Sequence, residues 1–285
     1  MSKLKIAIQK SGRLNLESLQ LLKKCGISID NGKDQLKVSI PNFPLELLYL
    51  RNSDIPQYIE DGVADIGIIG ENLLVEKEKN IQVIEKLGFS KCRVSLAIPK
   101  EVKNTTLQYF EGKKIATSYP NTLKKFLNSK NINSEIHSIS GSVEIAPNIG
   151  LADGICDIVS SGSTLFKNGL IETEIILKSE AVLVKSPSLT ATKQEILDKL
   201  LFRIRSILKA KDSKYILMNV PDNKIGAITK ILPVLKSPTI LPLAETGWSS
   251  LHSVINEHQF WDVIYDLKSA GAQDILIIPI DKMVS

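Results

Sequence analysis

The sequence predicts an α/β protein built from two lobes, with a smaller domain of four strands and two helices after them. Three observations predict this fold class. Short buried-type strands alternate with helical segments through most of the first 185 residues. Residues 87–99 indicate a long strand that leaves the first lobe, and residues 175–185 indicate strands that return to it. We therefore place the first lobe at 1–95 (completed by about 176–190), the second at 96–175 and the last domain at 191–285.

Length and composition fit a protein with proper hydrophobic cores and a site for a small anionic molecule. The 285 residues are enough for two or three domains, and 43% of them are hydrophobic. The net charge of +5 comes from lysines spread along the chain without interleaved aromatic residues, so we expect no nucleic-acid partner. The chain start has no signal-peptide core and no apolar run of about eighteen residues occurs, so we expect a cytoplasmic protein with no membrane partner.

Three cysteines and three histidines are scattered along the chain. The cysteines lie near apolar residues and are odd in number, which indicates buried free thiols rather than disulfides. The histidines show no metal-ligand spacing, so a structural zinc site is not expected.

A polar loop with two cations follows the first predicted strand, residues 3–8. A helix is expected over 14–24. Ligands of open α/β sheets bind at the carboxyl ends of the strands, where Lys10 and Arg13 lie. Arginine grips phosphate with two hydrogen bonds and lysine acts as a point charge, so the pair suits a pyrophosphate or triphosphate. The alternative is two surface cations near a helix start, which the helix dipole disfavours.

Two further charged residues follow strands of the same lobe. Residues 45–50 form an apolar strand that ends in Arg51, and residues 64–70 form a second that leads into Glu71. A short helix over 55–61 is expected between them. Both charged residues therefore reach the carboxyl edge of the predicted first sheet. Each is alternatively half of an ordinary surface ion pair.

The second lobe begins with a hydroxyl-rich junction between a strand and a helix. Residues 114–118 form the strand, and the proline after Tyr119 opens the helix. Thr117, Ser118 and Tyr119 stand at this junction, as candidate ligand-binding groups or as an ordinary helix cap. A further strand is expected at 135–139.

A loop of five small residues organises the segment 141–165. We expect a turn and an apolar helix over 143–152, then the buried strand 155–159, and a new helix after the loop. The loop comprises Ser160, Ser161, Gly162, Ser163 and Thr164. Between a strand and a helix N-terminus this composition predicts a phosphate cradle, because backbone N–H groups, hydroxyls and the helix dipole all favour an anion.

Asp153 and Asp157 precede this loop and suit the two hydroxyls of a ribose, or a magnesium ion. Phosphate and ribose together indicate a 5-phosphoribosyl group. The alternative is an ordinary loop in which Ser163 or Thr164 caps the helix and Asp157 is a solvated strand end.

The pattern changes after residue 190. An amphipathic helix over 191–211 precedes strands at 214–220, 239–242, 248–255 and 274–279, with helices at 223–232 and 257–270. This βαββαβ order is that of a ferredoxin-like domain. It contains no phosphate cradle and few candidate catalytic groups, which indicates a regulatory or assembly module.

Segments from one end of the chain to the other resemble a known family. They include IAIQKSGRL, DIPQYIEDGVADIGIIGEN, KKIATSYPNTLKKFL, GSVEIAPNIGLADGICDIVSSGSTL, SKYILMNVP, SPTILPLA and GAQDILIIPIDKM. In this order they resemble the long form of ATP phosphoribosyltransferase, the first enzyme of histidine biosynthesis. The block from Gly141 to Leu165 is the most specific of them.

The resemblance implies a fold, a reaction and partners. The family joins ATP and 5-phosphoribosyl 1-diphosphate, with magnesium, to give N1-(5-phosphoribosyl)-ATP and pyrophosphate. Its two lobes resemble the periplasmic-binding-protein fold, and its ACT-like third domain binds histidine as feedback inhibitor. Dimers and hexamers are implied for the assembly. The magnesium ion would be held mainly through substrate phosphates, with Asp157 as a candidate ligand.

The resemblance also implies roles for individual residues. Asp157 would contact the ribose hydroxyls, and residues 160–164 the 5-phosphate. The catalytic set would be Lys10, Arg13, Arg51, Glu144 and Asp157, whose cations neutralise pyrophosphate and whose carboxylates stabilise a cationic ribose. The rest of the cleft would be lined by Gly12, Glu71, Thr117, Ser118 and Tyr119. Histidine would contact Asn219, Leu235, Ser237, Thr239 and Asp274, although some members carry an acidic residue where Asn219 stands.

Two other functions are weighed against this one. A non-catalytic amino-acid-binding or sensing protein on the same two-lobed fold would not need the cradle with its paired aspartates. An inactive regulatory subunit of the short-form type would not need Lys10, Arg13, the cradle and the C-terminal domain.

Overall fold

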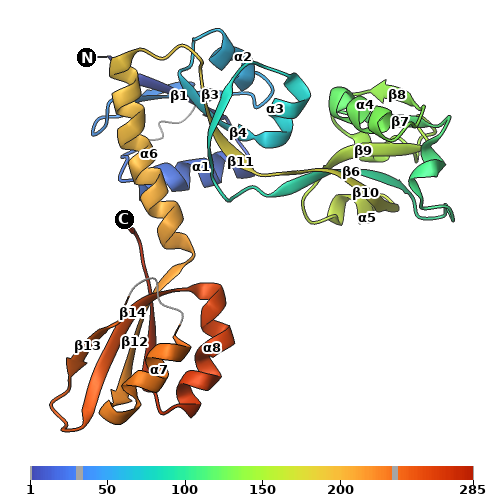
Figure 1. Ribbon diagram of the computed structural model, residues 1–285. Coiled ribbons are helices and arrows are strands. Elements are labelled where there is room, and N and C mark those ends of the chain that lie inside the picture. The colour runs from blue at the N-terminus through green and yellow to red at the C-terminus, as the bar shows by residue number, and fades with distance from the viewer. Residues whose placement is uncertain (1, 30–34, 233–236, 285) are drawn as a thin grey trace. The chain divides into compact units, whose positions relative to one another are not determined.

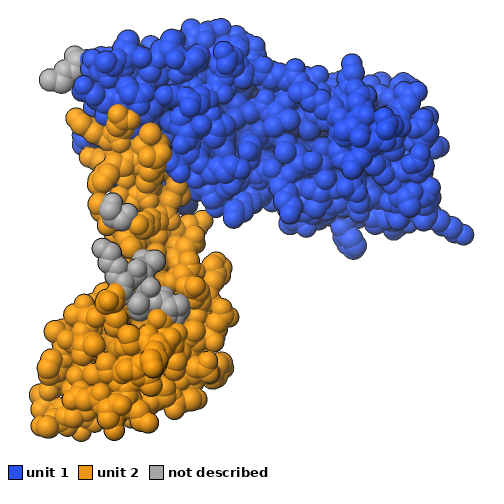
Figure 2. All heavy atoms as spheres, in the orientation of Figure 1, with its two compact units in different colours: residues 1–197 blue, residues 198–285 orange. Residues whose placement is uncertain are grey.

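The computed structural model describes residues 2–29, 35–232 and 237–284. The chain forms two compact units, Met1–Leu197 and Asp198–Ser285 (Figure 2). The division falls inside the long helix α6 (Ala191–Lys211), the helix that the sequence predicts over the same residues. Within the described ranges, no helix combines the length and the apolar character needed to span a bilayer.

The first unit contains two sheets (Figure 1). The first of them has the strand order β2-β3-β1-β4-β11-β5. Its strands are β1 (Leu4–Gln9), β2 (Lys37–Ser39), β3 (Leu45–Leu50), β4 (Ile66–Gly70), β5 (Gln82–Lys86) and β11 (Ala181–Lys185). Its helices are α1 (Arg13–Lys24), α2 (Ile55–Glu60) and α3 (Glu71–Lys77). β1 runs parallel to β3 and β4, so their carboxyl ends meet at one edge of the sheet.

The central strands are apolar on both faces because helices pack against them. Gly67 of β4 shows how closely α2 packs on the sheet. A Cβ added there would lie 2.6 Å from Cδ1 of Ile59 and 3.0 Å from Cγ2 of Ile55. Glycine therefore lets α2 lie directly on the strand.

The second sheet has the order β10-β6-β9-β7-β8 (Figure 1). Its strands are β6 (Cys92–Pro99), β7 (Lys114–Thr117), β8 (Glu135–Ser138), β9 (Gly154–Val159) and β10 (Leu170–Ser179). Its helical segments are η1 (Leu107–Phe110), α4 (Pro120–Ser129), η2 (Val143–Ile145) and α5 (Ser163–Lys167). The chain crosses between the sheets after β5 and returns between β10 and β11, which gives the predicted two-lobed, periplasmic-binding-protein-like region.

Two predictions at the level of elements need correction. The predicted helix over 143–152 is only the short η2, followed by turns. Pro147 has no N–H to continue a helix, and Gly150 takes a φ of +72°, so this apolar stretch cannot complete one. The returning segment 175–185 also divides: β10 belongs to the second sheet as far as Ser179, and only β11 joins the first.

The second unit contains a four-stranded antiparallel sheet of order β13-β14-β12-β15. Its elements are β12 (Ser213–Pro221), η3 (Asp222–Lys224), α7 (Ile225–Ile231), β13 (Thr239–Pro242), β14 (Trp248–Asn256), α8 (Glu257–Ser269) and β15 (Gln273–Pro279). Alternate residues of β12, such as Ile216 and Met218, share a core with Phe260 and Leu267 of α8. The predicted ferredoxin-like, ACT-like domain is thus confirmed.

Candidate functional site

Three charged residues come together at the carboxyl edge of the first sheet. The backbone N–H of Lys10 donates to the carbonyl of Leu50 at 2.8 Å, so Lys10 and Arg51 follow neighbouring strands. Glu71 follows β4 on the other side of β1, and its carboxylate lies 3.2 Å from Nζ of Lys86. The predicted grouping of these residues on one edge follows from the parallel register of β1, β3 and β4.

Gly12 and Arg13 begin α1 beside this edge. Gly12 has a φ of +92°, in the region that favours glycine, and lets the chain turn directly from the loop into the helix. Nη1 of Arg13 donates to Oγ of Ser160 at 3.2 Å, a contact between the two lobes. Nε of Arg13 lies 3.3 Å from Glu17.

The second sheet presents its own carboxyl edge. β7 and β9 are parallel, with Thr117 opposite Cys156, so residues 117–119 and 160–164 leave the sheet side by side. The Thr117 hydroxyl is buried and accepts the Tyr119 N–H at 2.8 Å, while Ser118 donates to the carbonyl of Ile139. Both hydroxyls thus shape the turn that places Tyr119.

The loop of residues 160–164 is held at its first residue and open at its centre. The Ser160 carbonyl accepts Nη1 of Arg93 at 3.1 Å. Ser161 donates to the Ser163 hydroxyl at 3.0 Å. Gly162 takes a φ of +82° just before α5, and a Cβ there would meet no atom within 4 Å. The loop therefore leaves space in front of its hydroxyls and of the helix start.

Arg93 is a site residue that the sequence reasoning missed. It lies on β6 opposite Val159, and its Nε and Nη2 donate to the two carboxylate oxygens of Glu172, each at 2.5 Å. Hydrogen bonding to Arg93 lowers the pKa of Glu172, which Ser95 also contacts. The Glu172 carboxylate thus fixes the orientation of the Arg93 guanidinium, which in turn holds the loop. Only the strand pairing reveals it, because Arg93 and Ser160 are far apart in sequence.

Asp157 has the most perturbed carboxyl group near the loop. Burial raises its pKa to about 6, against the lowering effect of the Ile158 N–H, and the charge of Glu144 adds to the rise. Burial raises the pKa of Tyr119 as well, and the charge of Asp157 contributes to that rise. Asp157 is thus near enough for its charge to interact with Glu144 on one side and with Tyr119 on the other.

Asp153 is placed away from this group. It precedes β9, a strand of six residues and about 20 Å, whereas the loop follows the other end. One Asp153 oxygen accepts the Lys114 N–H at 2.9 Å and the other lies 3.6 Å from Nζ of Lys113. The prediction paired it with Asp157 because both precede the loop in sequence, but Asp153 lies before the first residue of β9 and Asp157 is the fourth residue of that strand. Asp153 is therefore not included in the site.

A cavity of about 380 Å³ adjoins the loop. Its cationic lining groups outnumber its carboxylates, which suits a polyanionic ligand. The lining residues are Glu71, Lys86, Lys91, Cys92, Arg93, Ser160, Lys178, Ser179 and Glu180. Its lysines come from strands and connections that carry no motif, so the sequence alone did not identify them.

Within the part of the chain that the structure describes, no three His, Cys, Asp or Glu side chains gather as metal ligands. The charge of Glu144 contributes to the raised pKa of Asp157, so these two carboxylates are within electrostatic range of each other. Two oxygen ligands fit a magnesium ion whose remaining ligands come from substrate phosphates and water.

The residues predicted to bind histidine lie on the sheet of the second unit. Nδ2 of Asn219 donates to the Asp274 carboxylate at 3.0 Å. Thr239 begins β13, across β14 from β12, and Ser237 precedes it as an exposed residue. Leu235 lies outside the described residues. The structure thus brings Asn219 and Asp274 together and places Thr239 two strands away.

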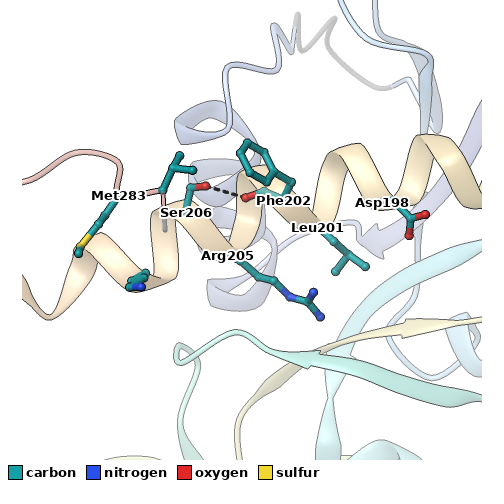
Figure 3. Close-up of a pocket in the computed structure, with 8 residues that line it drawn as sticks. Asp198, Leu201, Phe202, Arg205, Ser206 and Met283 are labelled. Carbon is teal, nitrogen blue, oxygen red and sulfur yellow. Dashed lines mark hydrogen bonds between the residues drawn. The ribbon is translucent and has the colours of Figure 1, made fainter.

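A separate cavity of about 400 Å³ lies along α6 in the second unit (Figure 3). The Met283 N–H donates to the Ser206 carbonyl at 3.0 Å, which ties the end of the chain to the helix. The lining residues are Asp198, Leu201, Phe202, Arg205, Ser206, Lys209, Met283 and Val284. Of the four described residues predicted for histidine, none lines this cavity.

Comparison with known proteins gives matches in both units. A family model described as ATP phosphoribosyltransferase matches residues 51–206, and one described as the HisG C-terminal domain matches residues 210–282. The ATP phosphoribosyltransferase of Cytophaga hutchinsonii is 56% identical over 281 residues, covering 99% of this chain and 98% of the relative. That of Phocaeicola vulgatus is 53% identical, with 99% of both chains covered.

A solved structure of an ATP phosphoribosyl transferase (HisG:HisZ) complex from Thermotoga maritima is also similar. It aligns with a TM-score of 0.62 and 32% identity, covering 72% of this chain and 98% of that chain.

Proposed function

This chain belongs to the ATP phosphoribosyltransferase family, and from that premise we propose how its own residues perform the family's reaction. The reaction is the first step of histidine biosynthesis, in which ATP and 5-phosphoribosyl 1-diphosphate give N1-(5-phosphoribosyl)-ATP and pyrophosphate. In the proposal, the 5-phosphate occupies the loop of residues 160–164 and the ribose hydroxyls face Asp157. The observation that carries it is the loop itself, fixed by Arg93 and open in front of Gly162.

The transfer needs positioning and charge rather than a nucleophilic side chain. Adenine N1 forms a bond to the anomeric carbon as the bond to the diphosphate oxygen breaks, and the bonding pair leaves with the diphosphate. Lys10, Arg13 and Arg51 are proposed to neutralise the phosphates, since all three are exposed beside the same edge of the first sheet. Asp157 and Glu144 are proposed to stabilise positive charge on the ribose.

Magnesium dependence is part of the proposal. Asp157 and Glu144 would hold the ion together with the substrate phosphates, and the bound ion would neutralise the leaving diphosphate. The cations of the cavity beside Ser160 are proposed to assist in holding the diphosphate.

Regulation and assembly extend the proposal to the second unit. That unit matches the C-terminal domain model, and we place the site for histidine, as inhibitor, at the joined pair Asn219 and Asp274. The Thermotoga maritima neighbour is a complex of two kinds of chain. For this chain, which carries its own C-terminal domain, we propose homo-oligomers, dimers and hexamers, in the cytoplasm.

The test is a direct assay of the transfer. Protein, ATP, 5-phosphoribosyl 1-diphosphate and magnesium are mixed with pyrophosphatase, and absorbance of N1-substituted adenine is followed with and without histidine. A rise that needs magnesium and is suppressed by histidine supports every part of the proposal. A rise that does not need magnesium would contradict the metal part of the proposal, and a rise that histidine does not suppress would contradict the regulatory part. No rise, with both substrates bound, would favour a binding or sensing protein.

A further inference from the structure

A carboxylate of the first lobe accepts hydrogen bonds from the first backbone N–H groups of a helix in the second lobe. Glu76 of α3 is 6% exposed. Its Oε2 accepts the Thr122 N–H at 2.9 Å and the Thr122 hydroxyl at 2.8 Å, and its Oε1 accepts the Asn121 N–H at 3.1 Å. The Asn121 side chain donates back to the Glu76 carbonyl at 3.0 Å. Four hydrogen bonds thus join α3 to the first turn of α4.

Asn72 makes a second set of contacts one turn earlier on α3. Its Nδ2 donates to the Tyr119 hydroxyl at 3.1 Å. Its backbone N–H donates to Oγ of Ser179, which donates in turn to Oδ1 of Asn72, both at 2.9 Å. A Cβ at position 70 would lie 2.3 Å from Oδ1 of Asn72, so the glycine there leaves room for this side chain. We call Asn72 and Glu76 together the α3 latch.

The α3 latch does more than stabilise one helix. A helix is ordinarily capped by the side chain of its own N-cap residue, but the N-cap of α4 is Tyr119, whose side chain makes no such bond. The carboxylate comes from the other lobe instead, and the positive end of the α4 dipole favours it. As a result, the segment 117–119 at the carboxyl edge of the second sheet is tied to the first sheet.

We propose that Asn72 and Glu76 are positioning residues of the transfer reaction. They set the carboxyl edge of the second sheet, with Tyr119 and the loop of residues 160–164, at a fixed separation from that of the first sheet. This inference rests on the proposed function, in which the two edges hold the two reacting substrates. Displacing one edge then separates adenine N1 from the anomeric carbon without removing a group that binds either substrate.

Glu76→Gln is the sharpest variant. A glutamine has one acceptor oxygen where the carboxylate has two, and its NH₂ group would face the N–H groups of α4. We expect kcat to fall roughly tenfold to a hundredfold, because small displacements of reacting groups cost about that much. The KM of each substrate should change by less than about threefold, since each edge keeps its own binding groups.

The control is Lys125→Ala, which breaks an exposed ion pair at 2.5 Å between Lys125 of α4 and Glu78, the residue that follows α3. Spin labels at Lys23→Cys and Lys124→Cys, one in each lobe, report the distance between lobes. We expect a broader distance distribution in Glu76→Gln and the wild-type distribution in the control. Asn72→Ala should reproduce the loss of kcat if Glu76→Gln does not fold.

The outcomes separate this inference from the proposed function. An inactive wild-type protein would contradict the proposed function. An active wild type whose latch variants keep kcat and the distance distribution would overturn the inference. A lowered melting temperature with unchanged kcat well below it would also overturn it, because α3 would then only cap α4.

Discussion

At the residue scale, Asp157 opposes folding stability in the position that we propose for the ribose site. Its folded pKa of about 6 lies above its ordinary value of 3.8, so the native state binds the proton more tightly than the unfolded state. Stability therefore falls as pH rises from about 4 to about 6, and the ionised group costs the fold on the order of 3 kcal/mol at neutral pH.

We therefore expect Asp157→Asn to raise the free energy of unfolding at pH 7 by about 1 to 3 kcal/mol while lowering kcat by roughly a hundredfold or more. The gain in stability should shrink as the pH approaches 4, where wild-type Asp157 is itself protonated in the native state. Urea unfolding at both pH values, with initial rates at pH 7, checks the two expectations.

Asp153→Asn is the matched control, because it makes the same change at the other end of β9. Asp153 is bonded to the Lys114 N–H, so its variant should lose about 0.5 to 1.5 kcal/mol of stability and keep kcat and KM within about twofold. If Asp153→Asn impaired transfer as much as Asp157→Asn, the placement of the ribose site would be wrong.

The pH dependence of the wild-type rate follows from the same group. If ionised Asp157 is required, kcat/KM should fall with decreasing pH around a midpoint near 6, by roughly tenfold per pH unit below it. Substrate phosphates also titrate near this pH. Glu144→Gln distinguishes titration of Asp157 from titration of the substrate. Removing the Glu144 charge lowers the pKa of Asp157, so the midpoint of kcat/KM should move to lower pH if Asp157 sets it. A midpoint that does not move would assign it to the substrate.

At the element scale, the loop of residues 160–164 depends on one backbone conformation. Gly162 has a φ of +82° in open space, so alanine there meets no clash and pays only the strain of the left-handed region, about 1 to 2 kcal/mol. We expect Gly162→Ala to raise the KM for 5-phosphoribosyl 1-diphosphate roughly fivefold or more, as the loop moves to relieve this strain. Gly162→Asn should raise it less, because asparagine tolerates this region.

Gly112→Ala provides the control for strain alone. Gly112 also has a positive φ, +69°, and no neighbour within 4 Å, but it precedes β7 at the opposite edge of the sheet. Both alanine variants should lose similar stability in thermal melts, and only Gly162→Ala should change the KM. Equal kinetics in the two would mean that the loop does not hold the phosphate.

The same element scale shows what the sequence can and cannot predict. Strands such as β3 and β9 are apolar runs bounded by polar loops, so local pattern locates them within a residue or two. The strand β5 has exposed and polar residues and gave no signal. Lys10, Arg51 and the loop of residues 160–164 each follow a predicted strand directly. The sequence therefore predicts that they lie at the carboxyl edges of the sheets. Arg93 and Glu76 act through contacts between distant segments, which periodicity does not encode.

At the scale of the whole molecule, the chain combines a two-lobed unit with a ferredoxin-like unit. The order of strands and helices predicted the second unit, because its alternating apolar residues repeat with the period of a half-buried sheet. The chemistry proposed for transfer lies in the first unit and that proposed for histidine lies in the second. Substitutions at Asp274 should therefore change inhibition by histidine and leave the uninhibited transfer rate unchanged.

We expect Asp274→Asn to weaken histidine inhibition roughly tenfold or more. The Asp274 carboxylate, joined to Asn219 at 3.0 Å, is the negative charge of the predicted site, and the α-amino group of histidine is a cation. Asparagine keeps the shape and removes this charge, so the concentration of histidine that halves the initial rate should rise, as should the dissociation constant measured by calorimetry.

Asp262→Asn, the same charge change at an exposed position of α8, is the control. Equal inhibition of wild type and Asp274→Asn would place histidine elsewhere, and an equal loss in Asp262→Asn would show that the overall charge of the unit, rather than this pair, attracts the ligand.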